Sequence, residues 1–356
     1  MTARILFLDD DPVVQVLRKI LCDAEDPSIT DYFAPETIDL SRLLAAANGL
    51  RRSDGGIIAA PDDSDFEDAT AIIFRRGEIT RALLARHPRL KLIQRLGEST
   101  EDIDLAATTE RGIRVSCLPR KTLIYTAEHG ILLMLALAKR LLAADHAVRD
   151  GATLHPGSPG GIVYNWTAMQ TTGLHGKTLG IVGMGQVGFL LAKLAHAFGM
   201  SIVYTKRRRA TPEQEAAVGA RLVALDELLA GSDFVSLMLP NAPENARYAG
   251  VAFFASMQPH ANFINMSRGA LVDEDALYRA LTSGRIAGAG LDVHATEPRP
   301  AQDRFAALDN VVLTPHLAGG AKSGLLDEFA VIMQNCHAAF RGEAPRHEVQ
   351  ARESTQ

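Results

Sequence analysis

The sequence predicts an α/β fold in which parallel sheets carry helices on both faces. Short runs rich in β-forming residues alternate with helical stretches along most of the chain, as expected for strand–helix–strand units. One such run, residues 178–182, leads through a glycine-rich loop directly into a helical stretch, which is typical of a parallel βαβ unit. At 356 residues the chain is long for a single hydrophobic core, so we expect two domains.

The first third of the chain contains the strands and helices expected for a first domain. The apolar β-rich runs are residues 5–8, 57–60, 71–74, 92–96 and 113–116. Stretches of helical composition between these runs are residues 12–24, 41–48 and 80–86. Because helical stretches rather than tight turns separate the strands, we expect the strands to pair in parallel.

A long helical stretch and an irregular segment follow. Residues 122–144 have an apolar body with basic residues near the end, which predicts one long helix. Residues 150–170 are rich in glycine and proline and contain the only tryptophan, Trp166. An irregular segment of this length is uncommon inside a compact domain, so we interpret it as an arm that reaches a partner subunit.

Composition and charge exclude several classes of protein. The net charge of −5 gives no general attraction to nucleic acid or to an anionic membrane. The N-terminal apolar run is too short for a signal peptide, and the most apolar run, residues 130–138, is far shorter than the about 20 residues that span a bilayer. The three cysteines lack the spacing of a metal site or a redox pair. We therefore expect a cytoplasmic protein that binds no metal ion.

The glycine-rich loop follows the pattern G-x-G-x-x-G and lies between a strand and a helix. This context, and not the glycines alone, indicates a dinucleotide site. The first glycine permits a tight turn, the second lets a pyrophosphate approach the backbone, and the third lets the helix pack on its strand. The free N–H groups of the helix N-terminus then bind the phosphates. The residues expected to contact the cofactor are Gly183, Gly185, Gln186, Val187 and Gly188.

The residues after the second strand of this domain bear on the choice of cofactor. An NAD site normally places Asp or Glu at the end of that strand, on the ribose 2′-hydroxyl. Here the strand ends at Thr205 and is followed by Lys206, Arg207, Arg208 and Arg209. Thr205 does not repel a 2′-phosphate, and Arg207 or a neighbour can pair with one. The pattern predicts a preference for NADP; if the arginines only form a solvated surface, NAD is the alternative.

Polar residues follow the later strands of the same domain. These strands are expected at residues 234–237, 262–265, 290–293 and 311–314, with a final helix at 321–341. Asn265, Asp292 and Thr314 lie at C-terminal strand ends, the edge at which open α/β sheets bind their ligands. We expect Asp292 to bind the carboxamide of a nicotinamide, and Pro240 and Met266, near two other strand ends, to contact the cofactor.

Three residues at this edge have side chains suited to the reduction of a keto acid. Arg268 can hold a carboxylate and the adjacent keto oxygen, and can stabilise negative charge on that oxygen. His316, which follows a stiff Thr-Pro turn, can deliver a proton to the oxygen near neutral pH. Glu297 is expected to orient the ring of His316 and to favour its protonated form. We interpret Arg268 and His316 as residues that also bind the substrate, and His294 as lying behind them or exposed.

Together these motifs resemble the D-isomer-specific 2-hydroxyacid dehydrogenase family over nearly the whole chain. The matching segments are residues 90–93, 97, 104, 127–129, 176–181, 183–188, 198–200, 268–269 and 314–316. The resemblance implies that Arg268, Glu297 and His316 are the catalytic set. It also implies that the substrate carboxylate meets backbone amides of a glycine loop at Gly97, next to Glu98.

The resemblance further implies the architecture of the chain. Members of the family have two Rossmann-like or flavodoxin-like domains, with the cofactor domain inserted into the substrate domain. The substrate domain is expected at residues 1–121 and 318–356, and the cofactor domain at residues 122–317. The family also forms homodimers through an extended arm of the cofactor domain, which matches the segment at 150–170.

Three positions depart from the family pattern. Glu98 stands in the glycine loop where relatives usually have an apolar residue, Cys117 where many have asparagine, and Met238 where many have histidine. These departures bear on the identity of the substrate more than on the type of reaction. Glu297 argues against the formate dehydrogenases of the family, which have glutamine in that role.

Two functions of different classes follow from these observations. The leading one is an enzyme that reduces a small 2-keto acid, such as glyoxylate or hydroxypyruvate, with NADPH, or that oxidises a D-2-hydroxy acid in the reverse direction. The alternative is a nucleotide-sensing protein with little turnover, like the transcriptional corepressors of the family. The complete set of three catalytic side chains favours the enzyme.

Overall fold

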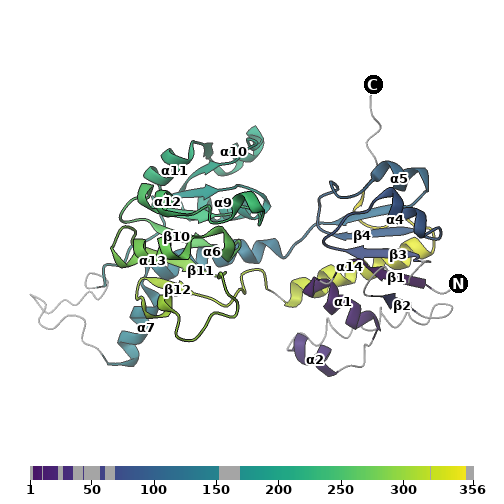
Figure 1. Cartoon of the computed structure of the whole chain (residues 1–356), viewed down its shortest axis with the longest axis horizontal. Helices are drawn as coiled ribbons and strands as arrows, with labels where there is room; N and C mark the ends of the chain where they lie inside the picture. Colours follow the sequence, from purple (N-terminus) through teal and green to yellow (C-terminus); the bar gives the residue numbers. More distant parts are fainter. Residues whose placement is uncertain are drawn as a thin grey trace, which may run out of the picture. The chain divides into compact units, whose positions relative to one another are not determined.

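The computed structural model describes residues 3–9, 11–22, 27–34, 43, 57–60, 69–151, 169–320 and 322–349. Contacts between residues divide the chain into two units (Figure 1): unit 1 is Met1–Thr122 with Ala321–Gln356, and unit 2 is Leu123–Gly320. The chain leaves unit 1 once and returns to it, so unit 2 is inserted into unit 1. The assignment of a substrate domain to residues 1–121 and 318–356, and of a cofactor domain to residues 122–317, stays a prediction.

Unit 2 is built on a parallel sheet whose strand order in the described residues is β12-β11-β10-β9-β6-β7-β8. The strands are β6 Thr178–Val182, β7 Ser201–Thr205, β8 Ala220–Leu222, β9 Phe234–Leu237, β10 Asn262–Asn265, β11 Gly288–Leu291 and β12 Val311–Leu313. The order reverses between β6 and β9, the kind of position at which open α/β sheets bind their ligands. Asn265 lies opposite Leu291, which lies opposite Leu313, so the chain leaves β10, β11 and β12 at the same edge.

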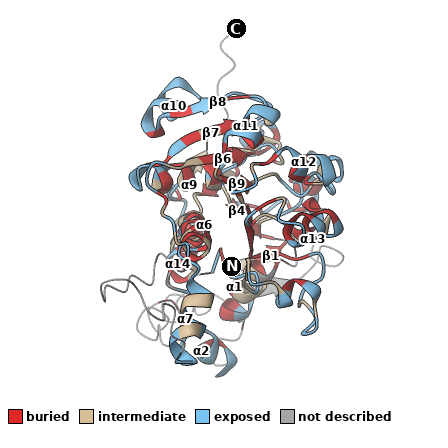
Figure 2. Ribbon diagram, turned by 90° about the vertical axis from the view of Figure 1, so that its left-hand side faces the viewer, coloured by how far each residue is buried: buried red, intermediate tan, exposed pale blue. Residues whose placement is uncertain are grey.

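Helices cover both faces of this sheet. On one face, α6 (Leu123–Ala138) and α9 (Gln186–Ala197) pack on the strands around one apolar cluster. On the other, α11 (Leu225–Gly231), α12 (Val251–Ser256) and α13 (Glu274–Thr282) enclose a second cluster. The central strands are buried on both sides (Figure 2), which explains why they are almost uniformly apolar in sequence. Two further helices are α10 (Pro212–Val218) and α7 (Leu141–Arg149), and α7 has no buried residue.

Unit 1 also has a sheet between two layers of helices. Its strand order in the described residues is β13-β5-β4-β3-β1-β2, parallel except for β13, which pairs antiparallel with β5. The strands are β1 Ala3–Phe7, β2 Ile57–Ala60, β3 Ala71–Phe74, β4 Leu92–Leu96, β5 Arg114–Leu118 and β13 Glu348–Val349. One apolar cluster joins the sheet to α1 (Pro12–Cys22), α2 (Pro27–Phe33) and α14 (Lys322–Phe340). A second joins it to α4 (Arg81–Arg86) and α5 (Leu105–Glu110).

The predicted fold class is confirmed, and most of the expected strands lie where the apolar runs predicted them. The expected single helix at 122–144 is wrong, because it is divided into α6 and α7 at Arg140, which has φ 50°. The strand expected at 290–293 begins and ends earlier, as β11, so Asp292 lies just beyond its end. Apart from Leu43, which is helical, the expected helix at 41–48 lies outside the described residues, as does most of the segment at 150–170 with Trp166.

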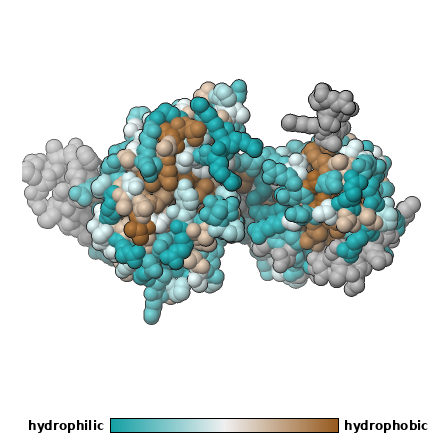
Figure 3. Space-filling model, turned by 45° about the horizontal axis from the view of Figure 1, so that its top comes forward, coloured by the Kyte–Doolittle hydropathy of each residue, from teal (hydrophilic) through white to brown (hydrophobic). Residues whose placement is uncertain are grey.

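Hydrophilic residues cover much of the surface of each unit in Figure 3, with apolar side chains exposed between them. Within the described ranges, no helix combines the length and the apolar character that crossing a bilayer requires. The same residues contain no group of three or more His, Cys, Asp or Glu side chains arranged to hold a metal ion.

Candidate active site

The glycine loop after β6 has the geometry of a phosphate-binding turn. Gly183 has φ 95°, and a Cβ there would lie 2.8 Å from the carbonyl oxygen of Met238, so both conformation and packing require glycine. A Cβ at Gly185 would meet no heavy atom within 4 Å, which leaves the backbone open to a ligand. Gly185 precedes α9 and gives it no side-chain cap, so the helix N-terminus can donate N–H groups to a phosphate. The loop therefore fits the pyrophosphate of a dinucleotide.

A buried tyrosine anchors the loop after β7. The hydroxyl of Tyr204 donates to Glu215 of α10 at 2.6 Å and accepts from the N–H of Ala210 at 3.0 Å. Burial and the bond to Glu215 raise the pKa of Tyr204, so the hydroxyl stays a donor. Arg209 donates through Nε and Nη2 to the two oxygens of Glu215 at 2.9 and 2.8 Å. The carboxylate of Glu215 is therefore balanced by a guanidinium.

The basic residues of this loop are not equivalent. Arg209, which the sequence places in one basic run with its neighbours, is engaged by Glu215. Thr205 is half-buried at the end of β7, and its carbonyl accepts from the N–H of Gly183 at 2.9 Å. The exposed basic residues that form no ion pair with another described residue are Lys206, Arg207 and Arg208.

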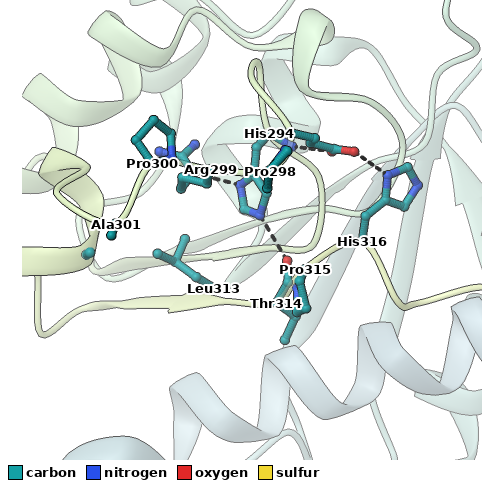
Figure 4. A pocket seen from close by; sticks show the side chains of 11 residues that line it. His294, Pro298, Arg299, Pro300, Ala301, Leu313, Thr314, Pro315 and His316 are labelled. Carbon is teal, nitrogen blue, oxygen red and sulfur yellow. Dashed lines mark hydrogen bonds and ion pairs between the residues drawn. The ribbon is translucent and has the colours of Figure 1, made fainter.

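His316 and Glu297 form a hydrogen-bonded pair (Figure 4). Nδ1 of His316 lies 2.7 Å from Oε2 of Glu297, and the two side chains are 43% and 35% exposed. An ionised carboxylate only accepts hydrogen bonds, so Nδ1 carries a hydrogen. Nε2, at the other side of the ring, is then the nitrogen that can exchange a proton with a ligand.

The surroundings of Glu297 keep its carboxylate charged. Partial burial acts to raise the pKa of Glu297, but the hydrogen bonds from His316 and from the backbone N–H of His294, 2.9 Å from Oε1, outweigh burial and lower it. Each carboxylate oxygen thus has its own donor. A charged carboxylate in this position fixes the orientation of the imidazole through the hydrogen bond to Nδ1.

Arg268 extends from a loop that Asn265 ties together. The buried side-chain amide of Asn265 accepts from the N–H of Ser267 and donates to the carbonyl of Arg268, both at 3.1 Å. A Cβ at Gly269 would lie 2.0 Å from the carbonyl carbon of His294, so only glycine fits there. The loop of the exposed Arg268 therefore packs directly against the loop that carries the glutamate.

A buried aspartate organises the turn that carries His316. Oδ1 of Asp292 accepts from the hydroxyl of Thr314 at 2.7 Å and from the N–H of Leu317 at 3.0 Å, and Oδ2 accepts from the N–H of Ala318 at 2.9 Å. The carbonyl of Asp292 accepts from the N–H of His316 at 2.8 Å. These bonds hold His316 at φ 54°, a conformation that residues other than glycine rarely adopt. Asp292 is fully buried in this role, and its contact with a nicotinamide stays a prediction.

The loop between β11 and β12 is held by His294, which the sequence singled out, and by Arg299, which it did not. His294 is 8% exposed, so it is buried and not exposed. Its Nδ1 accepts from Nε of Arg299 at 3.0 Å, and its Nε2 donates to the carbonyl of Thr314 at 2.9 Å. Arg299 also pairs with Glu274 at 2.5 Å and with Asp303. Nothing in its sequence neighbourhood separates Arg299 from a surface arginine.

A cavity of about 620 Å³ lies beside the Glu297–His316 pair. Figure 4 shows its lining, with His294 and Arg299 on one side and the end of β12 with Pro315 on the other. Most of the remaining lining side chains are apolar: Pro298, Pro300, Ala301, Ala306 and Leu313.

The other predicted cofactor residues differ in how much side chain they expose. Gln186 is exposed and Val187 is half-buried, both in the first turn of α9. Pro240 is exposed after β9. Met266 is buried, and its side chain packs toward Gly130 of α6, so its backbone is the part that can reach a cofactor.

Gly97 and Glu98 lie in unit 1, after β4. Gly97 has φ 145°, and its N–H donates to the carbonyl of Leu118 at 3.1 Å. That N–H is engaged, so the predicted contact with a substrate carboxylate has to come from other amides of the loop. Glu98 is exposed, and Cys117 beneath the loop is buried, with Sγ 3.7 Å from the carbonyl of Ser99. Burial raises the pKa of Cys117, which keeps it a neutral thiol.

Comparison with known proteins gives consistent matches. A family model described as "D-isomer specific 2-hydroxyacid dehydrogenase, NAD binding domain" matches residues 131–318. Glyoxylate reductase of Thermococcus litoralis is 39% identical over 75% of this chain and 79% of that protein. Glyoxylate/hydroxypyruvate reductase B of Pectobacterium carotovorum is 36% identical over 79% of this chain and 86% of that protein. The crystal structure of a glyoxylate reductase from Paecilomyes thermophila is 27% identical and superimposes with a TM-score of 0.63, covering 96% of this chain and 97% of that one.

The strand order of unit 2, its glycine loop and these matches define a nicotinamide-dinucleotide-binding oxidoreductase. More specifically, the chain belongs to the D-isomer specific 2-hydroxyacid dehydrogenase family. The resemblance identified from the motifs is confirmed.

Proposed function

We propose that this protein reduces a small 2-keto acid, such as glyoxylate or hydroxypyruvate, with NADPH, and oxidises the corresponding D-2-hydroxy acid in the reverse direction. The names of two relatives, glyoxylate reductase and glyoxylate/hydroxypyruvate reductase, support this substrate class. The observation that carries the proposal is the hydrogen-bonded His316–Glu297 pair. The loop that carries Glu297 packs against the loop of Arg268, at the edge of unit 2 where open α/β sheets bind their ligands.

Each of the three side chains has a separate task. When bound, the reduced nicotinamide supplies a hydride to the carbonyl carbon of the keto acid. Arg268 holds the carboxylate and the keto oxygen, and its N–H groups stabilise the negative charge that develops on that oxygen. The protonated ring of His316 donates its Nε2 hydrogen to the same oxygen, which completes the hydroxyl group. Glu297 stays ionised throughout and orients the ring.

The exposed basic residues after β7 support a preference for NADPH. Lys206, Arg207 and Arg208 directly follow β7, at whose end the ribose of the adenosine is expected, and no carboxylate stands there. Glu215, which is bonded to Tyr204 at the base of this loop, is paired with Arg209, so its charge is balanced and does not repel a 2′-phosphate. A guanidinium that is free of other partners can then pair with the phosphate.

We also propose a homodimer formed through unit 2. Leu132 of α6 and Leu141 and Leu142 of α7 are each 49% exposed, and Val148 is 81% exposed. In Figure 1, α7 extends from the body of unit 2, and the described residues bury none of its side chains. Sedimentation or light scattering of Leu142→Asp should show monomers where the parent protein is dimeric.

The direct test is steady-state kinetics with a panel of 2-keto acids and both nucleotides. The proposal predicts turnover of small keto acids with NADPH, and a loss of about 10²- to 10⁴-fold in kcat/KM in Arg268→Ala, since this residue serves both binding and charge stabilisation. The control is Arg221→Ala. It removes an exposed arginine of β8 that is paired with Glu227 of α11.

Two results would contradict the proposal. If Arg268→Ala keeps its efficiency within a few-fold of Arg221→Ala, the assigned role of Arg268 is wrong. If no keto acid is turned over although NADPH binds, the nucleotide-sensing alternative replaces the enzyme.

A further inference from the structure

His129 lies on α6, away from the residues assigned to the reaction, yet its side chain joins the network beneath the catalytic turn. Nε2 of His129 is 3.0 Å from Oγ1 of Thr314 and 3.4 Å from Oδ1 of Asp292, so the hydroxyl is the closer partner. The single hydrogen of that hydroxyl is donated to Asp292 at 2.7 Å. Thr314 must therefore accept from His129, whose Nε2 carries a hydrogen.

His129 and Asp292 are both buried, so the loss of a hydrogen bond between His129, Thr314 and Asp292 cannot be made good by solvent. His129 is 6% exposed and Asp292 is 0% exposed. Burial lowers the pKa of His129, against the opposing effect of the Asp292 charge, which fits a neutral ring with one donor nitrogen. A buried carboxylate requires hydrogen-bond donors on its oxygens. Because Asp292 is fully buried, solvent water does not reach it to replace a lost donor. Thr314 is one of three such donors, with the N–H groups of Leu317 and Ala318.

The packing of α6 on β11 places His129 over this aspartate. A Cβ at Gly290 of β11 would lie 3.0 Å from Cβ of Leu133, so the helix touches the strand at this point. His129 precedes Leu133 by one helical turn, which is about 6 Å along the helix axis. Asp292 follows Gly290 by two residues, which is about 6.6 Å along a strand. The two side chains therefore meet because helix and strand run in opposite directions with matching rises.

We infer that His129 is a positioning residue for His316. It fixes the hydroxyl of Thr314 on Asp292, and Asp292 in turn holds the backbone N–H groups that follow His316 in the turn. The inference rests on the proposed function only in that His316 is taken to be the proton donor. Without His129, the hydroxyl is free to rotate and Asp292 loses a fixed donor. The turn then relaxes toward conformations in which His316 no longer needs a positive φ.

The first test measures the turn itself and does not depend on activity. Amide hydrogen exchange of the segment 314–320 is compared between the parent, His129→Leu and Thr314→Val, with strand β7 as the internal reference. Exchange of Leu317 and Ala318 should accelerate about tenfold or more in both variants while β7 is unchanged, because only the local opening becomes easier. Thr314→Ser, which keeps the hydroxyl, and His129→Gln, which keeps an N–H near the position of Nε2, should restore most of the protection.

The second test measures the reaction. In His129→Leu and Thr314→Val, kcat should fall about 10- to 100-fold, as expected for outer residues that orient a catalytic group, while the dissociation constant of NADPH stays within about two-fold. The double variant should lose no more than the worse single variant, because both changes interrupt one network. If His129→Leu does not fold, the pair Thr314→Val and Thr314→Ser decides.

Three results would overturn the inference: unchanged exchange and kcat in both single variants, losses that multiply in the double variant, or a Thr314→Ser variant as impaired as Thr314→Val. The two proposals fail separately. A parent protein without turnover, in which His129→Leu still accelerates exchange at 314–320, contradicts the enzyme and supports the positioning role. If the parent is active but His129→Leu changes neither the exchange at 314–320 nor kcat, only the positioning role is contradicted.

Discussion

The turn that carries His316 and the loop that carries Arg207 both follow strands of unit 2, but they are held in different ways. The turn is held by the buried side chain of Asp292, which accepts hydrogen bonds from two backbone N–H groups and a hydroxyl. Among the described residues, Tyr204 and Glu215 anchor the loop at its base, and its basic side chains from Lys206 to Arg208 are exposed.

The difference follows from what each region has to do. A proton transfer requires its two heavy atoms at hydrogen-bond distance, so a shift of about 1 Å in His316 is costly to the rate. Attraction between a guanidinium and a phosphate falls slowly with distance, so side chains that move can still recognise the charge. We therefore expect large kinetic effects at the turn, moderate effects on nucleotide choice at the loop, and effects on stability alone at the opposite edge of the sheet.

The largest effect should come from His316→Asn, which removes the proton donor. We expect kcat for keto-acid reduction to fall about 10²- to 10⁴-fold with little change in NADPH affinity. Steady-state kinetics and nucleotide fluorescence titration measure the two quantities. The matched control is His260→Asn, an exposed histidine 3.1 Å from Asp233 at the other edge. A similar loss of kcat in both variants would show that the comparison between the edges is wrong.

Glu297→Gln should have a smaller effect with a distinctive pH dependence. Glu297 has a lowered pKa, so its carboxylate is present above that value and is lost as pH falls through it. We expect kcat to fall about tenfold or more, because the ring loses its charged partner. The acid limb that protonation of Glu297 gives to the parent's pH profile should be absent in the variant, because the amide of glutamine does not titrate. A profile with parental limbs would contradict the pairing of Glu297 with His316.

At the loop, Arg207→Ala should weaken NADPH selectively. The loss of one charge-assisted contact to the 2′-phosphate predicts about a tenfold rise in KM for NADPH and little change for NADH. The control is Arg247→Ala, an exposed arginine paired with Asp273 at 2.6 Å. Parallel changes for the two nucleotides would contradict recognition of the phosphate. Equal efficiency of NADH and NADPH in the parent protein would do the same.

At the opposite edge, Asp233→Asn should change stability and leave kcat unaltered. Asp233 accepts from the N–H of Thr178 at 2.8 Å and from Nζ of Lys177 at 3.0 Å. Burial alone would raise the pKa of Asp233, but these bonds lower it overall. A lowered pKa in the folded state gives stability that is full above the unfolded pKa and is lost as pH falls through the folded one. Chemical denaturation should show a loss of about 1–3 kcal/mol in the variant at neutral pH, shrinking in acid. A difference that does not depend on pH would refute the role of the charge.

How far the sequence could predict this molecule depends on how local each feature is. The glycine loop and the strands around it were predictable, because the required spacing lies within a few residues. The break at Arg140 was not, since residues on both sides favour a helix. Arg209 reads as part of a basic run, and only the position of Glu215 on the following helix reveals that it is engaged.

The site shows the same limit. Arg268, Glu297 and His316 could be proposed from the sequence because each follows a strand in a characteristic local setting. The role of Asp292 in the turn could not be predicted, because it depends on which N–H groups the folded turn presents. The contact of His129 with Thr314 could not be predicted either, because it depends on the register between α6 and β11. The residue types at sheet edges can be predicted from periodicity. The partner of each hydrogen bond is known only once the packing of helices and strands is known.

The central claim is that Arg268 and His316 act on one carbonyl oxygen, and a double-variant cycle in a single turnover tests it most directly. Nicotinamide absorbance is followed after mixing excess enzyme with NADPH and glyoxylate, for the parent, Arg268→Ala, His316→Asn and the double variant. When two groups act on the same atom, removing the second after the first costs little more. The account therefore predicts that the fold-loss of rate in the double variant is much smaller than the product of the two single fold-losses. Losses that multiply fully would contradict a shared site.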